Sequence, residues 1–240
     1  MCTATYLPLS GGFILTHSRD ERTARPSAEP PEAYLHKQHL VVYPKDPQGG
    51  GTWIAGSAHR TVCLLNGAFV AHRPEPPYRH SRGLVPLRFF EQNDIDTFLR
   101  QFDADGLEPF TLLMLEGGRL TELRWNGRQT FVQEKDPGQA HIWSSVTLYT
   151  PEVVRRRENW FQDWQRQTPQ PTVEAIRQFH LQGGAGDARN AIRMNRDNAL
   201  MTLSLTSIVH QSGAVRLIYD DFIHPFSSQQ LIPLSSHAVL

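Results

Sequence analysis

The sequence predicts an α+β protein in which strands open the chain, helical segments interrupt them twice, and strands close it. Short alternating segments bounded by turn residues fill the first third of the chain and the stretch 110–133. Two segments with helical periodicity follow a proline-rich loop, and a longer amphipathic segment begins at Pro151. Apolar residues make up 39% of the chain and charged residues 20%, as in an ordinary globular protein.

An N-terminal hairpin is the first predicted element. Residues 2–7 alternate small or polar side chains with larger ones, Ser10-Gly11-Gly12 is typical of a turn, and residues 13–15 begin a second strand. The outer ends of two such strands lie opposite each other, about 5 Å apart. We therefore expect Ser18-Arg19-Asp20-Glu21 to lie beside Cys2, with Arg19 within reach of the sulfur.

The remaining elements follow from the same periodicities. Further strands are predicted at 39–43, 52–56, 60–65, 110–116, 119–125, 128–133, 201–209 and 215–219. Helices are predicted at 84–92, 94–102, 151–167 and 172–181. The proline-rich segments 22–34 and 72–83 are expected to be ordered surface loops.

Composition narrows the classes of function. The 240 residues fit one domain, 1–240. Lysine plus arginine equals aspartate plus glutamate at 24 each, so no net field favours nucleic acid as a partner. No apolar stretch reaches the roughly 18 residues of a membrane span, and the N-terminus lacks the pattern of a secretion signal. Only Cys2 and Cys63 are cysteines, which fits a reducing compartment, and we expect a cytoplasmic protein.

Cys2 is the first candidate for chemistry. Methionine aminopeptidases remove Met1 when the next side chain is small, so the mature chain is expected to begin with the free α-amine of Cys2. A thiol has a pKa of about 8.5 and an α-amine one of about 7.7–8.0, so this amine can act as the base for its own thiol. A neighbouring Arg19 would favour the thiolate, and Asp20 would hold the protonated amine.

These residues also have a structural interpretation. A cysteine at position 2 can be incidental, and an arginine–aspartate pair after a strand is often a solvated loop end or a structural ion pair. Cys63 lies in the apolar run TVCLLN and is expected to be a small buried hydrophobe. Spacing alone favours this interpretation.

Five segments together resemble one known family. MCTATYLP, SRDERTARP, GGGTWIAGS, LLNGAF and HSRGLV are similar in kind and order to the Asn-Arg-Asp-Glu (NRDE) family, also called the Transport and Golgi organisation protein 2 family. The resemblance covers at least residues 1–85, and more loosely the whole chain. This family is similar to N-terminal nucleophile (Ntn) hydrolases of the cysteine type, which include penicillin V acylase and bile salt hydrolase. The resemblance therefore implies a four-layer αββα sandwich, which agrees with the predicted order of elements.

The resemblance assigns roles to individual residues. It implies that Cys2 is the nucleophile, that Arg19 and Asp20 are its nearest polar partners, and that Asn66 supplies an oxyanion or substrate contact. Trp53, in the motif GGTW, is expected beside the site.

Three positions depart from the family pattern. Ser18 stands where the family usually has the first asparagine of its motif, and Ser145, in WSSVTLY, stands where many members have Ser-Asn. Both serines are kept as candidate substrate contacts, although a hydroxyl donates one proton where an amide donates two. Leu203 stands where some relatives have arginine. These changes affect the expected activity more than the expected fold.

Two functions from different classes remain open. The first is a cysteine amidohydrolase or acyltransferase, acting without a cofactor on a carbon–nitrogen bond of a small amide through a Cys2 thioester. The second is a non-enzymatic protein for haem binding or trafficking on the same scaffold, with Cys2 or a histidine as iron ligand. The candidate histidines lie in predicted loops or at strand ends, where a solvated histidine is more common than a ligand: His17, His36, His39, His72 and His80.

Overall fold

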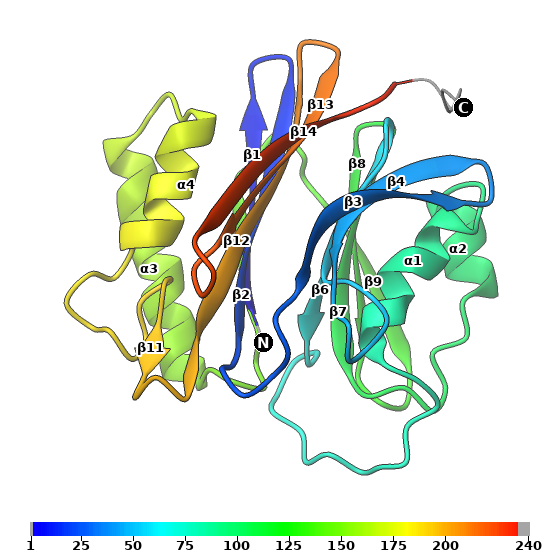
Figure 1. The fold of residues 1–240 in the computed structure, drawn as a ribbon, viewed down its shortest axis with the longest axis horizontal. Helices are drawn as coiled ribbons and strands as arrows, with labels where there is room; N and C mark the ends of the chain where they lie inside the picture. Colours follow the sequence, from blue (N-terminus) through cyan, green and yellow to red (C-terminus); the bar gives the residue numbers. More distant parts are fainter. Residues whose placement is uncertain (1, 235–240) are drawn as a thin grey trace.

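Two antiparallel sheets lie face to face in the computed structural model, which describes residues 2–234 (Figure 1). Sheet A contains, in spatial order, β10 (His141–Ser144), β1 (Cys2–Leu9), β2 (Gly12–Arg22), β12 (Leu200–Gln211), β13 (Ala214–Asp221) and β14 (Phe226–Ile232), with β11 (Asn195–Arg196) paired to β12. Sheet B contains β3 (Glu29–His36), β4 (His39–Lys45), β5 (Ile54–Gly56), β6 (Arg60–Asn66), β7 (Phe110–Glu116), β8 (Arg119–Trp125) and β9 (Thr130–Lys135).

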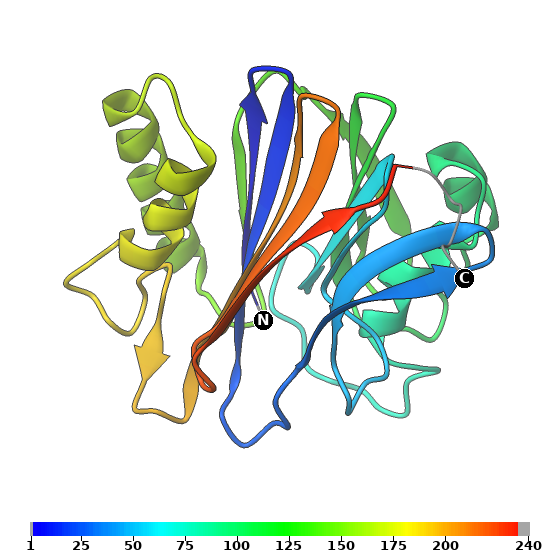
Figure 2. The same cartoon turned by 45° about the horizontal axis from the view of Figure 1, so that its top comes forward.

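Helices cover the outer face of each sheet. Sheet A is covered by α3 (Pro151–Gln167) and α4 (Val173–Gln182), and sheet B by the 3-10 turn η1 (Arg82–Leu84), α1 (Val85–Phe90) and α2 (Ile95–Gln101). Figure 2 shows the resulting order of layers, helices, sheet A, sheet B and helices. The predicted αββα sandwich is therefore confirmed.

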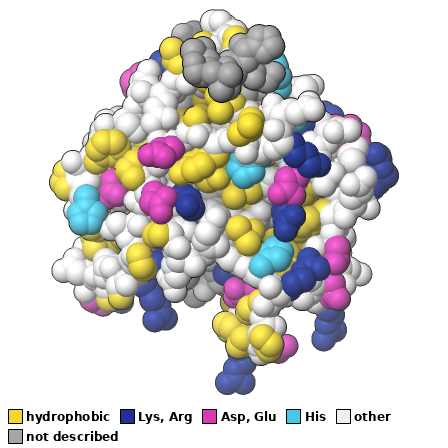
Figure 3. All heavy atoms as spheres, turned by 45° about the vertical axis from the view of Figure 1, so that its right-hand side comes forward, with side chains coloured by type: hydrophobic (Ala, Val, Ile, Leu, Met, Phe, Trp, Pro, Cys, Tyr) yellow, Lys and Arg dark blue, Asp and Glu magenta, His cyan; other side chains and the backbone are white. Residues whose placement is uncertain are grey.

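Apolar side chains fill each of the three spaces between the layers. Leu15 and Ile54 are fully buried between the two sheets, Phe161 of α3 packs on the outer face of sheet A, and Phe89 of α1 packs on that of sheet B. Charged side chains of both signs are interspersed over the face that carries α1 and α2 (Figure 3). This distribution agrees with the balanced charge of the sequence.

The predicted N-terminal hairpin forms, and its outer ends meet as expected. β1 pairs with β2 so that Cys2 lies opposite Arg19 and Thr5 opposite Thr16. Gly11, in the turn, has a φ of +76°, which favours glycine. The start of β1 and the end of β2 therefore meet at one end of the sandwich.

The predicted loop at 22–34 is partly wrong. Residues 29–36 form β3, an edge strand of sheet B, although Pro30 and Pro31 lie in it. Proline cannot donate to a strand ladder, but an edge strand tolerates this loss on its unpaired side. The register with β4 also shifts between Glu29 and Glu32, where the prolines lie. The edge strands β10 and β14 were likewise not expected from the sequence.

The two predicted C-terminal helices are confirmed, and both are capped. Thr150 accepts a hydrogen bond from the Val153 amide at the start of α3, and Thr172 accepts one from the Ala175 amide at the start of α4. Proline occupies the first position of α3, where it is favoured.

A layer of polar side chains separates sheet A from these helices. His180 of α4 is buried, and its ring nitrogens lie 2.8 Å from Thr5 Oγ1 and 2.8 Å from Ser18 Oγ. Burial lowers the pKa of His180 to about 3, and the positive charges of Arg177 and Arg157 act in the same direction. His180 is therefore a neutral imidazole that links β1, β2 and α4.

We expect His180 to make the fold sensitive to acid. Because its pKa is about 3 in the folded state against 6.5 for a solvated histidine side chain, the unfolded chain binds the proton first. The stability it contributes is complete above pH 6.5 and is lost as the pH falls towards about 3. The unfolding free energy can be measured by urea titration at several pH values between about 6.5 and 4. His180→Gln should reduce the slope of this free energy against pH by up to about 1.4 kcal/mol per pH unit. The exposed His224→Gln is the control, and equal slopes for both variants would refute this assignment.

Candidate active site

A cavity of about 470 Å³ lies at the end of the sandwich where β1 begins and β2 and β6 end. Residues from both sheets and from the loops before β5, η1 and β7 line it. Of the residues predicted to form a site, the cavity wall contains Cys2, Arg19, Trp53 and Asn66. Met1, whose removal the sequence predicts, lies outside the described residues.

Cys2 contributes a buried thiol to the wall of the cavity. Only 4% of the residue is exposed, and its carbonyl accepts a hydrogen bond of 2.8 Å from the Ser145 amide. Burial raises the pKa of the Cys2 thiol, and the Asp20 carboxylate raises it further, whereas a hydrogen bond from the Asp20 backbone opposes this rise. The thiol is therefore protonated at neutral pH, so its use as a nucleophile requires a base.

Arg19 lies over the Trp53 ring beside Cys2. Its guanidinium carbon is 4.5 Å from the centroid of the Trp53 ring, and 5% of the residue is exposed. The nearest carboxylate oxygen, on Asp46, is 3.9 Å away. The guanidinium donates no hydrogen bond to any residue in the range 2–234, so its N–H groups remain available at the cavity wall.

Asp20 is directed to the other face of sheet A. Consecutive strand residues point to opposite faces, so the side chain after Arg19 faces the helices. Its carboxylate accepts hydrogen bonds from Tyr149 and, at 2.6 Å, from Thr202 Oγ1. Burial raises the pKa of Asp20, and the positive charge of Arg157 opposes this rise. The Asp20 side chain does not line the cavity. The residue contributes to the site through its backbone, which hydrogen-bonds to the Cys2 thiol.

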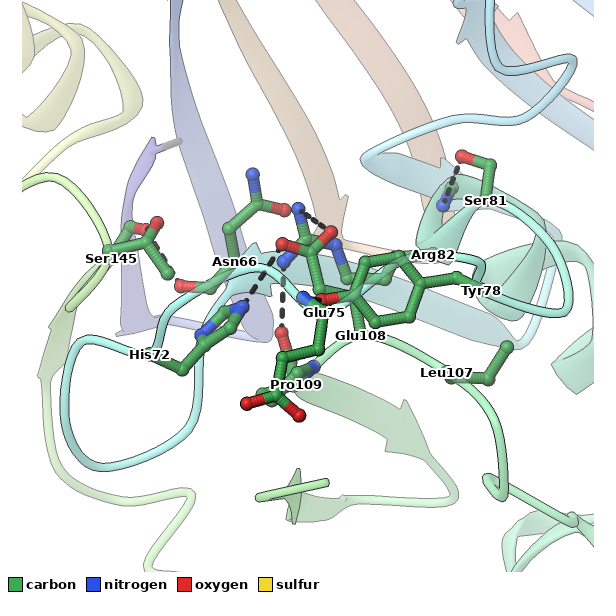
Figure 4. Close-up of polar contacts among 12 residues, drawn as sticks. Asn66, His72, Glu75, Tyr78, Ser81, Arg82, Leu107, Glu108, Pro109 and Ser145 are labelled. Atoms are coloured by element: carbon green, nitrogen blue, oxygen red, sulfur yellow. Dashed lines mark hydrogen bonds and ion pairs between the residues drawn. The ribbon is translucent and has the colours of Figure 1, made fainter.

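Ser145 connects β1 of sheet A to β6 of sheet B behind the residues that line the cavity (Figure 4). Its hydroxyl donates a 2.7 Å hydrogen bond to the Asn66 carbonyl and lies 3.0 Å from Thr147 Oγ1. A serine has one hydroxyl proton, so Thr147 is the donor in the second contact. Asn66 and Thr147 line the cavity, and Ser145 holds both in position from behind.

Ser18 does not share the cavity. Its hydroxyl is hydrogen-bonded to His180 on the helix-facing side of sheet A. Ser18, predicted as a substrate contact, is therefore not among the residues that line the cavity. Leu203 is buried, with 6% of the residue exposed.

The glycines before Trp53 shape the cavity in two ways. Gly50 has a φ of +68°, as expected for a glycine turn. Gly51 is needed for a different reason, because a Cβ there would lie 2.0 Å from the Gly83 carbonyl oxygen. This close approach lets the Thr52 amide donate a 2.8 Å hydrogen bond to that oxygen, which holds η1 beside the cavity.

Several charged residues at the cavity mouth were not predicted to share a site, although His72 was a candidate iron ligand. Glu108 lies 2.8 Å from Arg82 Nη2 and 3.0 Å from His72 Nε2, and Asp46 accepts hydrogen bonds from Arg25 (Figure 4 shows the Glu108 group). Arg25 and His72 lie in the two proline-rich segments, and Asp46 and Glu108 in other loops, whose position in space cannot be read from spacing. The signal in the sequence that could have indicated this group was the high density of charged residues in and beside the two proline-rich segments.

The sequence profile of the family described as Transport and Golgi organisation 2 matches residues 1–208. The chain belongs to this family. The match includes every residue assigned to the cavity above, and it confirms the resemblance seen in the N-terminal motifs. No curated protein is significantly similar to this member of the Transport and Golgi organisation 2 family.

Solved structures of two Ntn hydrolases share the fold of this family member. Penicillin V acylase from Agrobacterium tumefaciens superposes with a TM-score of 0.63 at 11% identity, over 97% of this chain and 86% of the acylase. A variant of conjugated bile acid hydrolase from Clostridium perfringens gives a TM-score of 0.60 at 10% identity, over 96% of this chain and 92% of the hydrolase. Within residues 2–234, the structure contains no helix that is long and apolar enough to cross a membrane.

Proposed function

We propose that the protein is a cysteine amidohydrolase or acyltransferase that acts on a small amide through Cys2. The observation that carries this proposal is the position of Cys2, which lies at the first residue of β1 in a cavity wall, opposite Arg19, on a scaffold shared with two amide hydrolases. An N-terminal nucleophile needs this combination of a chain end, a thiol and a pocket.

The proposed reaction begins with the α-amine of Cys2, which is free once Met1 is removed. The amine takes the thiol proton, and the thiolate attacks the carbonyl carbon of the substrate. The carbon–nitrogen bond then breaks, the leaving amine takes a proton, and the acyl group remains as a thioester on Cys2. Attack by water releases a carboxylic acid, whereas attack by an acceptor amine transfers the acyl group. In this scheme Arg19 stabilises the thiolate, and Asn66, which lines the same cavity, contacts the oxyanion.

The raised pKa of the Cys2 thiol fits this order of events. A thiol that is protonated at rest resists oxidation and becomes a nucleophile only when the adjacent amine removes its proton. The Arg19 guanidinium can turn towards the negative charge that develops on the sulfur. Within the described residues it makes no hydrogen bond that such a movement would break.

Haem binding remains a prediction, and the cavity residues fit a porphyrin poorly. Seven charged side chains line the cavity, whereas a porphyrin face requires apolar contacts: Arg19, Glu21, Arg22, Arg25, Asp46, Arg82 and Glu108. Among the histidines proposed as iron ligands, His72 alone belongs to this lining, and its Nε2 is bonded to Glu108.

Intact mass combined with thiol labelling tests the proposal. We expect a mass without Met1 and alkylation of Cys2 by iodoacetamide at a rate that rises with pH. Cys63 is the internal control, because it is 0% exposed and burial raises its pKa well above 9.0, so it should stay unlabelled in the folded protein. Retained Met1, or equal labelling of the two cysteines, would contradict the proposal.

A further inference from the structure

The cavity lining contains more cationic than anionic side chains. The lining contains four arginines and three carboxylates. Asp46 is held by Arg25, through a 2.5 Å ion pair, and lies 3.9 Å from Arg19. Glu108 is shared by Arg82 and His72, and Glu21 lies 4.0 Å from Arg25 Nε and accepts a hydrogen bond from the Arg22 backbone amide. Asp46 and Glu108 therefore each already serve two cationic or potentially cationic side chains, and Glu21 is paired with Arg25.

Arg22 is left without a carboxylate. It is the last residue of β2, it is exposed, and it belongs to the cavity lining. Its guanidinium forms no ion pair and no hydrogen bond with any residue in the described part of the chain. A planar guanidinium presents five N–H donors in a fork that matches carboxylate or phosphate oxygens.

Arg19 provides a second, independent sign of an anion site. Only 5% of the residue is exposed, its nearest carboxylate is Asp46 at 3.9 Å, and its guanidinium donates no hydrogen bond within residues 2–234. Guanidinium N–H groups that donate no hydrogen bond within the described residues are thus present at Arg19 and at Arg22, both in the cavity lining. Apolar side chains in the lining, besides Cys2, come from Trp53, Leu64 and Pro74.

We propose that this cavity binds a small polar molecule through an oxyanion group, carboxylate or phosphate, which Arg22 holds at the rim. The proposal rests on the proposed function in one respect, since the bound molecule would be the substrate of Cys2. Arg22 is a specificity residue in this scheme, because it recognises the charge of the substrate and does not act on the amide.

The alkylation of Cys2 measures this recognition without requiring any amidase activity. Iodoacetate and iodoacetamide carry the same leaving group and differ in charge, so the ratio of their rates at Cys2 reports the attraction of an anion to the cavity. Arg22→Gln should lower the iodoacetate to iodoacetamide ratio by about three- to fivefold at low ionic strength. Arg155→Gln, an exposed arginine on α3 with no contact to the cavity, is the matched control and should not change it. Identical ratios in the wild type, Arg22→Gln and Arg155→Gln would overturn the proposal.

Ligand-dependent melting distinguishes the two sources of the oxyanion and does not depend on thiol reactivity. Succinate or inorganic phosphate should raise the melting temperature of the wild type and of Arg155→Gln by a few degrees, and uncharged succinamide should not. Arg22→Gln should lose most of this effect. Stabilisation by succinate alone identifies a carboxylate site, and stabilisation by phosphate identifies a phosphate site. Absence of stabilisation by both anions would refute the anion site while leaving the Cys2 chemistry to its own test.

Discussion

Cys2→Ala should abolish turnover of amide and thioester probes and leave the fold intact. The expected loss is several orders of magnitude, because a thioester cannot form without the sulfur and water in the same cavity is a far weaker nucleophile. The stability cost should be about 1 kcal/mol, since the change removes one small polarisable group from a residue at the start of a strand. Probe turnover and thermal melting measure the two effects separately.

Cys63→Ala is the control for this experiment. Cys63 is fully buried between the sheets, lies opposite Ile54 of β5, and does not line the cavity. We expect it to change stability slightly and turnover not at all. If Cys2→Ala and Cys63→Ala behave alike in probe turnover, thermal melting and haem titration, Cys2 has no special chemistry, and both the enzymatic and the haem-binding functions lose their central residue.

Local pattern was sufficient to predict the hairpin and the meeting of its outer ends. Alternation over residues 2–7 and the glycine turn fix which residues of β1 and β2 lie opposite each other, so the pair Cys2 and Arg19 follows from counting. The same alternation places Asp20 on the opposite face from Arg19, towards Tyr149 and Thr202. Because neighbouring residues of a strand point to opposite faces, the side chains of Arg19 and Asp20 do not enter the same cavity.

Other parts of the site depend on contacts that the sequence does not reveal. Gly51 approaches Gly83, and Ser145 reaches the Asn66 carbonyl, across segments that belong to different elements. Strand β3 escaped prediction because its prolines resemble a loop and are tolerated only through its position at an edge. Sequence periodicity specifies which face a side chain occupies, but the partner on that face is set by how the layers meet.

Arg157 illustrates this limit, because it lies in an amphipathic helix pattern and yet is fully buried. Its exposed fraction is 0%, and it donates hydrogen bonds to Thr3 Oγ1 and to the carbonyls of Asn190 and Ala191. Its guanidinium carbon is also 3.6 Å from the centroid of the Tyr149 ring. One side chain of α3 thus joins β1, next to Cys2, to the segment before β11.

Arg157→Met should cost about 3–5 kcal/mol of unfolding free energy in urea titrations at neutral pH. The substitution leaves two carbonyls without their donor, and it removes the positive charge that opposes the rise in the pKa of Asp20. The exposed Arg155→Met, on the same helix, is the control and should leave stability unchanged.

The pH dependence of Arg157→Met separates the loss of charge from the loss of packing. Without Arg157, the pKa of Asp20 in the folded state should rise further above its unfolded value. A carboxyl group with a raised folded-state pKa binds its proton more tightly when folded, so stability is lost as the pH rises from the unfolded to the folded pKa. The deficit of Arg157→Met should therefore be smaller at acidic pH, and Asp20→Asn in the same chain should restore part of the stability at neutral pH. A deficit that is the same at every pH, with no rescue by Asp20→Asn, would assign the effect to packing and hydrogen bonds alone.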